Sequence, residues 1–126
     1  MGLRPLSLKE LDMATVSPVV NLSITDAPRY VWEALATGDT INALKLSGAG
    51  ARRAAVQIFG TLGGATVKIQ VSNDGTNFYD IKDIHNTAVS TGAAAVFEFT
   101  SSALYIKPAI TGGSGDDVDV ILFMRD

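Results

Sequence analysis

The sequence predicts an all-β domain, an antiparallel β-sandwich of jelly-roll or Greek-key type, and two observations support that prediction. Apolar and polar residues alternate with a period of two through most of residues 30–126, as they do in half-buried strands. Clusters of glycine, asparagine, aspartate and serine separate these stretches at short intervals. No long stretch of helical periodicity interrupts them, which argues against α/β folds such as the Rossmann fold.

About seven or eight short strands are expected, as in a sandwich or a barrel. The clearest covers residues 66–72, where three apolar residues alternate with polar ones. The other expected strands cover residues 30–35, 40–46, 54–59, 78–82, 95–100, 104–110 and 118–124. Pro108 lies inside one of them and predicts an edge position or a bulge, because proline cannot donate a hydrogen bond to a neighbouring strand.

The same alternation predicts which side chains form the core. The expected core residues are Val56, Ile58, Val67, Ile69, Val71, Phe97, Phe99, Leu104, Ile106, Val120 and Leu122. The last strand, residues 118–124, is apolar on both faces in its middle. We therefore expect a central strand covered on both sides, or a strand whose outer face is closed by another subunit or by the N-terminal residues.

Residues 1–28 differ from the rest and are predicted to form an N-terminal arm, which leaves residues 29–126 as the sandwich domain. Ser7 and Glu10 fit a capping box, so a short helix over residues 8–13 is expected, although it needs a surface to pack on. Pro18 keeps the extended stretch that follows out of a central strand. The arm either folds back on its own domain or lies on a neighbouring subunit. Its apolar residues are the candidate interface: Leu3, Leu6, Leu8, Leu11, Val16, Val19 and Val20.

The composition limits the possible functions. A chain of 126 residues with 47% hydrophobic residues fits one domain with a real core. It contains no cysteine, so disulfides, thiolate metal sites and cysteine nucleophiles are excluded. A net charge of −3 argues against a general nucleic-acid binder. We expect no membrane span and no signal peptide, since no apolar run is long enough.

The low charged fraction, 18%, leaves two interpretations open. Soluble domains usually contain about 25% charged residues. Other chains could cover much of this surface, or the protein could simply be a β domain rich in small residues.

No pattern of residues predicts catalysis, and we expect the chain not to be an enzyme and to need no cofactor. His85 is the only histidine, and no G-x-S-x-G sequence presents a serine nucleophile. The glycine-rich stretch 60–64 lacks the lysine and the following helix of a phosphate-binding loop.

The acidic and basic clusters do not predict a specific binding site either. Asp116, Asp117 and Asp119 follow a glycine-rich stretch without the spacing of a calcium loop, so a solvated turn is expected and no metal site. Arg52 and Arg53, with Arg29, could contact an anion or an acidic neighbour, although adjacent strand residues point to opposite faces.

Residues 67–81 carry the most distinctive pattern. An alternating strand leads into the turn Asn73-Asp74-Gly75, where the glycine is expected at positive φ, and an aromatic-led strand returns from Phe78. This hairpin resembles that of discoidin-type and related β-sandwich modules. Taken with residues 103–108, the chain is similar to small β-sandwich proteins of tailed-bacteriophage particles, including capsid decoration (cement) proteins.

The resemblance implies a non-enzymatic virion structural protein on the capsid exterior, bound to the major capsid protein and assembled in the host cytoplasm. It also implies a homo-oligomer, a dimer or a trimer, with terminal arms that tie neighbours together. The alternative is a carbohydrate- or receptor-binding module of a phage fibre or surface protein. That function needs exposed aromatic side chains beside polar loops, and the candidates are Trp32, Phe78, Tyr79 and Tyr105.

Overall fold

The structure is a computed structural model that describes residues 15–21, 29–46 and 52–125. Within these ranges the chain forms strands and no helix, so no described segment is a helix that could cross a membrane. The strands are β1 (Thr15–Val16), β2 (Val19–Asn21), β3 (Arg29–Leu35), β4 (Thr40–Ile41), β5 (Leu44–Lys45), β6 (Arg52–Thr61), β7 (Thr66–Ser72), β8 (Tyr79–Asp80), β9 (Ser90–Thr91), β10 (Ala95–Ser101), β11 (Tyr105–Thr111) and β12 (Asp117–Arg125).

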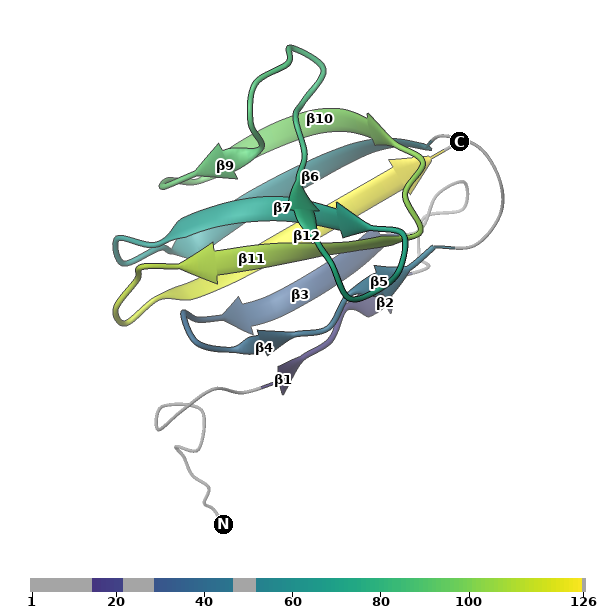
Figure 1. The fold of residues 1–126 in the computed structure, drawn as a ribbon. Helices are drawn as coiled ribbons and strands as arrows, with labels where there is room; N and C mark the ends of the chain where they lie inside the picture. The colour runs from purple at the N-terminus through teal and green to yellow at the C-terminus, as the bar shows by residue number, and fades with distance from the viewer. Residues whose placement is uncertain (1–14, 22–28, 47–51, 126) are drawn as a thin grey trace.

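Two antiparallel sheets pack face to face, which confirms the predicted β-sandwich (Figure 1). The first, here called the β12 sheet, has five strands in the order β10-β6-β12-β3-β2. The second, the β7 sheet, has the order β5-β11-β7-β8, and β9 also pairs with β7. A short parallel pair of β1 and β4 lies beside them.

The core lies between the two sheets and contains the alternate residues of the long strands. Most of the predicted core residues are buried there, with Val71 and Phe97 only partly covered. Leu104 is the exception, since its side chain is 36% exposed. It precedes β11 in a bend, where its N–H donates to Asn73 Oδ1 at 3.0 Å. The prediction for Leu104 was therefore wrong because the period of two begins only at Tyr105.

A β-bulge in β3 turns into the core two residues that simple alternation would place on opposite faces of the sheet. Trp32 pairs with Val120 and Leu35 with Val118, so two residues of β3 lie opposite one residue of β12. Ala34 absorbs the extra length at a positive φ of 57°. Trp32 and Leu35 are consequently both buried, which simple alternation does not predict.

The expected strand over residues 40–46 is interrupted. Asn42 N–H donates to the carbonyl oxygen of Val16, and the Asn42 carbonyl accepts a hydrogen bond from Trp32 Nε1 at 2.9 Å. These bonds divert the backbone away from a continuous ladder, so β4 and β5 form separately.

Pro108 occupies the edge position that the sequence predicts. Its partner Ile69 forms its backbone hydrogen bonds on the other side of β7. The Ile69 N–H donates to the Val89 carbonyl, and the Ile69 carbonyl accepts from the Ile81 N–H. The Ile69–Pro108 pair is therefore one that exchanges no backbone hydrogen bonds. On the opposite side β5 pairs only with Tyr105 and Ile106, so the missing N–H of Pro108 leaves no gap in a ladder.

Part of the predicted arm belongs to the sandwich. Residues 15–21 form β1 and β2, and β2 pairs with β3 at an edge of the β12 sheet, as Pro18 predicts. Val16 packs against the core of its own chain. The predicted helix and the residues Leu3, Leu6, Leu8 and Leu11 lie outside the described residues.

Candidate interaction surface

Apolar side chains gather in the middle of the outer face of the β12 sheet, among exposed polar residues such as Arg53 and Glu33. One row of neighbouring residues crosses all five strands of this sheet: Val96, Gln57, Ile121, Val31 and Val19. The outermost two, Val96 and Val19, are 62% and 54% exposed. Only Gln57 contributes a polar side chain. We call these five residues the apolar row.

A second row runs beside it and ends in opposite charges. Glu98, Ala55, Phe123 and Arg29 are consecutive register partners on β10, β6, β12 and β3. Three strand spacings separate Glu98 from Arg29, about 14 Å, so these two side chains do not pair within one copy. We call these four residues the charged row.

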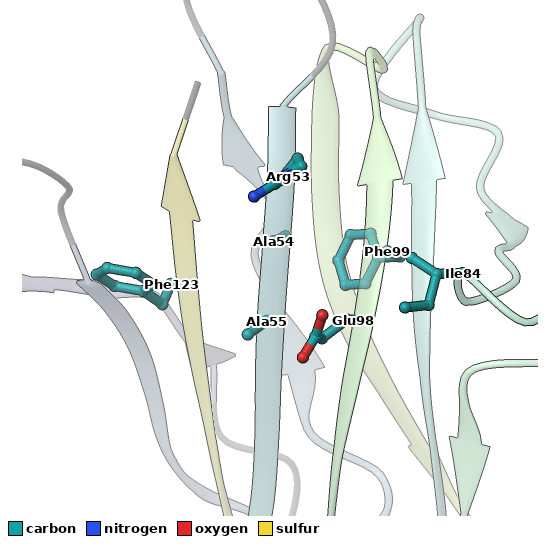
Figure 2. Close-up of a pocket in the computed structure, with 7 residues that line it drawn as sticks. All are labelled: Arg53, Ala54, Ala55, Ile84, Glu98, Phe99 and Phe123. Atoms are coloured by element: carbon teal, nitrogen blue, oxygen red, sulfur yellow. The ribbon is translucent and has the colours of Figure 1, made fainter.

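Two shallow hollows flank Ala55 on this face, because its side chain is small between larger neighbours. The first, of about 370 Å³, is lined by residues that include Arg53, Glu98 and Phe123 (Figure 2). Ile84 reaches it from the β8–β9 connection, since its N–H donates to the Glu98 carbonyl at 2.9 Å. The second hollow, of about 190 Å³, lies between Ala55 and residues of both rows. This face is therefore both apolar and uneven.

Arg29 ends the charged row with an unusual feature. Its Nε is buried and has no hydrogen-bond partner among the described residues. Buried donors are nearly always paired in native proteins, so an unpaired one indicates a missing acceptor. Of the other two arginines expected to act together, Arg53 lines the larger hollow, and the side chain of Arg52 is not described.

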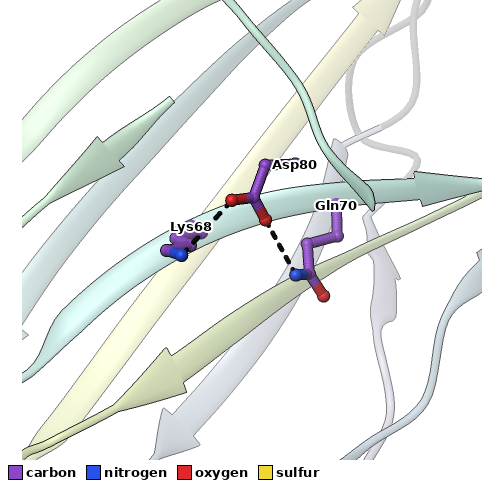
Figure 3. A network of polar contacts seen from close by, with 3 residues as sticks. All are labelled: Lys68, Gln70 and Asp80. Atoms are coloured by element: carbon purple, nitrogen blue, oxygen red, sulfur yellow. Dashed lines mark hydrogen bonds and ion pairs between the residues drawn. The ribbon is translucent and has the colours of Figure 1, made fainter. Parts of the chain in front are cut away.

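The outer face of the β7 sheet is polar and satisfied by its own neighbours. Asp80 accepts a hydrogen bond from Gln70 Nε2 at 2.9 Å and forms an ion pair with Lys68 Nζ at 3.2 Å (Figure 3). The Gln70 hydrogen bond, followed by the Lys68 contacts, lowers the pKa of Asp80. The carboxylate is thus held by two side chains of the neighbouring strand in its own sheet.

Two lysines of the same face cover aromatic rings. Lys107 Nζ lies 4.5 Å from the centroid of the Phe78 ring, and Lys45 Nζ lies 5.9 Å from that of Tyr105. Both distances fit cation–π attraction. Neither ring is therefore presented bare to a ligand, in contrast to the apolar row on the opposite side of the molecule.

The Asn-Asp-Gly hairpin folds as the sequence predicts, with Gly75 at a φ of 78°. Asp74 Oδ1 accepts hydrogen bonds from the backbone N–H groups of Thr76 and Asn77, both at 2.8 Å, and from Ser72 Oγ. The backbone bonds from Asn77 and Thr76 are the main cause of a strongly lowered pKa of Asp74. The carboxylate closes the turn.

Tyr79 is the one candidate aromatic that projects into solvent, with 70% of its surface exposed. It borders a shallow groove of about 470 Å³ whose lining includes Asn73, Asp74 and Asn77. Trp32, by contrast, is buried in the core, and Phe78 and Tyr105 are half-buried.

His85 lies exposed in the β8–β9 connection. Asp83 Oδ1 accepts hydrogen bonds from the backbone N–H groups of His85, at 2.8 Å, and Thr87, at 2.9 Å. The Thr87 bond is the main reason that the pKa of Asp83 is lowered. This aspartate therefore orders the loop backbone.

Two of the three clustered aspartates accept backbone hydrogen bonds, each from a different residue. Asp116 is buried and accepts hydrogen bonds from the N–H and Oγ1 of Thr37, at 2.9 and 2.7 Å. Asp119 Oδ1 accepts one from the Ala34 N–H at 2.9 Å, inside the bulge, while Asp117 is exposed. Among the described residues, no three histidine or acidic side chains are grouped as metal ligands.

The glycine-rich stretch 60–64 is a tight turn between β6 and β7. A side chain at Gly60 would collide with the backbone of Asp117, and the Gly63 carbonyl accepts the Ser114 N–H at 3.0 Å. Close packing of two hairpin turns accounts for these glycines.

The two outer rows were not found from the sequence, although the apolar Ile121 and Phe123 of β12 pointed to a covered outer face. Val96 and Val19 are far apart in the chain, and only the strand order places them in one row with Ile121. No family model matches the chain, and no curated protein or solved structure matches it.

Proposed function

We propose that this chain is a non-enzymatic structural protein of a virus particle, a capsid decoration protein that binds the major capsid protein from outside. The observation that carries the proposal is the apolar row on the outer face of the β12 sheet, with Ala55 and Phe123 beside it. Contiguous exposed apolar surface on a small domain marks contact with other macromolecules. The polar β7 face, with its internal ion pair, supports the assignment of contact to one side.

The energetic argument concerns repeated contacts. Burying about 400 Å² of apolar surface contributes roughly 10 kcal/mol at about 25 cal/mol per Å². Association itself costs about 4–15 kcal/mol, so a single contact of this size binds weakly. Several such contacts made by one protein to the same shell bind more tightly. A shell offers the same site many times, and a protein with two contact surfaces links neighbouring sites.

The N-terminal residues supply the second contact in this proposal. Leu3, Leu6, Leu8 and Leu11 lie in the segment before β1, and an isolated helix of that length needs a surface to pack on. We assign this segment to the shell or to a neighbouring copy.

The proposal is tested on virus particles purified from cells that carry the gene. Quantitative mass spectrometry and immunogold labelling should find the chain on the particle exterior in a fixed ratio to the major capsid protein. Particles made without the gene should release their genome at a lower temperature. Absence of the chain from purified particles contradicts the proposal.

The exposed Tyr79 favours one alternative, a carbohydrate- or receptor-binding module of a fibre. Its ring offers an apolar face beside the amide groups of Asn73 and Asn77, the combination that a sugar ring requires. If this is the function, a glycan array should bind the wild-type chain, and Tyr79→Ala should remove binding while Tyr105→Ala leaves it. Absence of binding to any glycan removes this alternative.

A further inference from the structure

We propose that two copies of this chain pair through the outer faces of their β12 sheets, with Glu98 of each copy opposite Arg29 of the other. This inference rests on the proposed function and deepens it, because it assigns the β12 face to a second copy and leaves the contact with the major capsid protein to the N-terminal residues. The contact would be a sheet-on-sheet packing like the one that forms the sandwich itself.

The charged row is self-complementary. A two-fold axis parallel to the strands and between β6 and β12 exchanges the positions of β10 and β3, which are the first and fourth strands of this sheet. Glu98 therefore meets Arg29 of the second copy at one side, and the reverse pair forms at the other. An isologous interface requires such a pattern. A foreign partner would not require it.

Side-chain size follows the same symmetry. The axis exchanges β6 with β12, so Phe123 of one copy faces Ala55 of the other. Ala55 is where the two hollows meet, and they offer room for a ring. In the apolar row, the same operation places Val96 opposite Val31 of the second copy.

The Nε of Arg29 is buried within its own chain and lacks an acceptor among the described residues. A carboxylate from a second copy would therefore contact the terminal nitrogens of the guanidinium.

The size of the face sets the expected strength. About this axis four strands of each copy overlap, which span about 19 Å, and their outer residues extend about 25 Å, so roughly 480 Å² per copy is covered. Specific interfaces bury about 800 Å² per partner, so this contact falls near the lower limit. We expect a dimer that forms at high concentration and that the crowded surface of a shell would favour.

The test uses the full chain and charge exchange. Sedimentation velocity over a concentration series should show a reversible monomer–dimer equilibrium for the wild type. Glu98→Arg and Arg29→Glu each create two like-charge pairs in the dimer, and each should weaken dimerisation by about tenfold or more. An equimolar mixture of the two variants should recover the dimer, because every pair is then again of opposite charge.

Two further variants test whether dimerisation depends on this face. Ala55→Arg fills the hollows and should prevent dimerisation without changing the melting temperature by more than a few degrees. Lys45→Glu alters charge by the same amount as Arg29→Glu on the opposite sheet and should leave the monomer–dimer equilibrium unchanged.

Several outcomes overturn the inference. These are a wild type that stays monomeric at all concentrations, a dimer that survives both charge variants, or a mixture that fails to recover. If the variants dimerise normally but no longer bind purified particles, this face contacts the shell protein instead. The proposed function would then be kept, and the proposed dimer would be rejected.

Discussion

At the scale of single residues, turn geometry in this protein is held by side chains that accept backbone hydrogen bonds. Asp74 and Asp83 do so in their own loops, and Asp116 connects two distant turns through Thr37. Each carboxylate replaces a backbone partner that the turn cannot supply. Asp116 and Asp119 lie close together in the sequence, but they accept hydrogen bonds from different backbone groups.

Asp74 should make stability depend on acid pH. Its pKa in the folded chain lies below the usual 3.8, so its contribution is complete above that value and is lost as the pH falls through the lowered pKa. Asp74→Asn should therefore reduce the free energy of unfolding at about pH 7 more than at about pH 2. Urea titrations at both pH values measure this difference. Asn73→Ala, which removes an uncharged acceptor, should act equally at both, and equal effects of Asp74→Asn would contradict the assignment.

Ala34 stores backbone strain in the bulge. At a φ of 57° its Cβ crowds the backbone, which costs an L-residue about 1–2 kcal/mol, whereas glycine is unstrained there. The greater freedom of glycine in the unfolded chain offsets roughly half of the gain. We expect Ala34→Gly to raise the free energy of unfolding by about 0.5–1 kcal/mol by urea titration. Ala109→Gly, in β11 at an ordinary φ, should lower it.

At the scale of elements, β12 organises the molecule. It pairs with β6 along its whole length and with β3 on its other side (Figure 1). Its inward residues contribute to the core. Its outward residues Ile121 and Phe123 belong to the two rows of the interaction surface. β12 is a central strand, and the domain's own core covers one of its faces, while the expected cover of the outer face stays a prediction.

The two faces of β12 should differ in their effect on stability. Leu122 is buried, so Leu122→Ala should lower the free energy of unfolding by about 2–5 kcal/mol. Ile121 points outward and is half-buried, so Ile121→Ala should cost about 1 kcal/mol in the monomer. Chemical denaturation at low protein concentration compares them, because a dimer would add stability to Ile121. Equal losses would mean that the outer face is covered within a single chain.

At the scale of the whole molecule, the outer faces of the two sheets differ in chemical character. The β7 face is polar and its charges contact their own neighbours, whereas the β12 face carries an apolar row beside a row that ends in opposite charges. Residues 1–14 precede the first described strand. The described residues thus present two different outer faces, and a linking protein needs at least two contact surfaces.

Deletion of residues 1–14 should separate assembly from folding. The described domain begins at Thr15, and Val16 already packs on the core, so the melting temperature should change little. Retention on purified particles should be lost, since the leucines would be absent. Full-length chain with Leu6→Asp and Leu8→Asp is the matched control and should behave in the same way. Collapse of the truncated domain in a thermal melt would assign the segment to its own core.

The amino-acid sequence by itself determined the class of fold, most strand positions, the Asn-Asp-Gly turn and the edge position of Pro108. These depend on local chemistry: a period of two, a glycine at positive φ and a missing N–H act wherever they occur. The burial of Leu35, the exposure of Leu104 and the division of residues 40–46 could not be predicted in this way. They depend on a bulge and on hydrogen bonds between residues distant in the chain.

The interaction surface was decided by tertiary structure alone. The sequence marked Val19 as a candidate interface residue and Ile121 as part of an apolar outer face, but these two and Val96 form one row only because β2, β12 and β10 belong to the same sheet. Likewise, Glu98 and Arg29 are 69 positions apart, and strand order and register place them at opposite ends of one row. Strand order results from packing the whole core, a non-local balance that no short stretch of sequence contains.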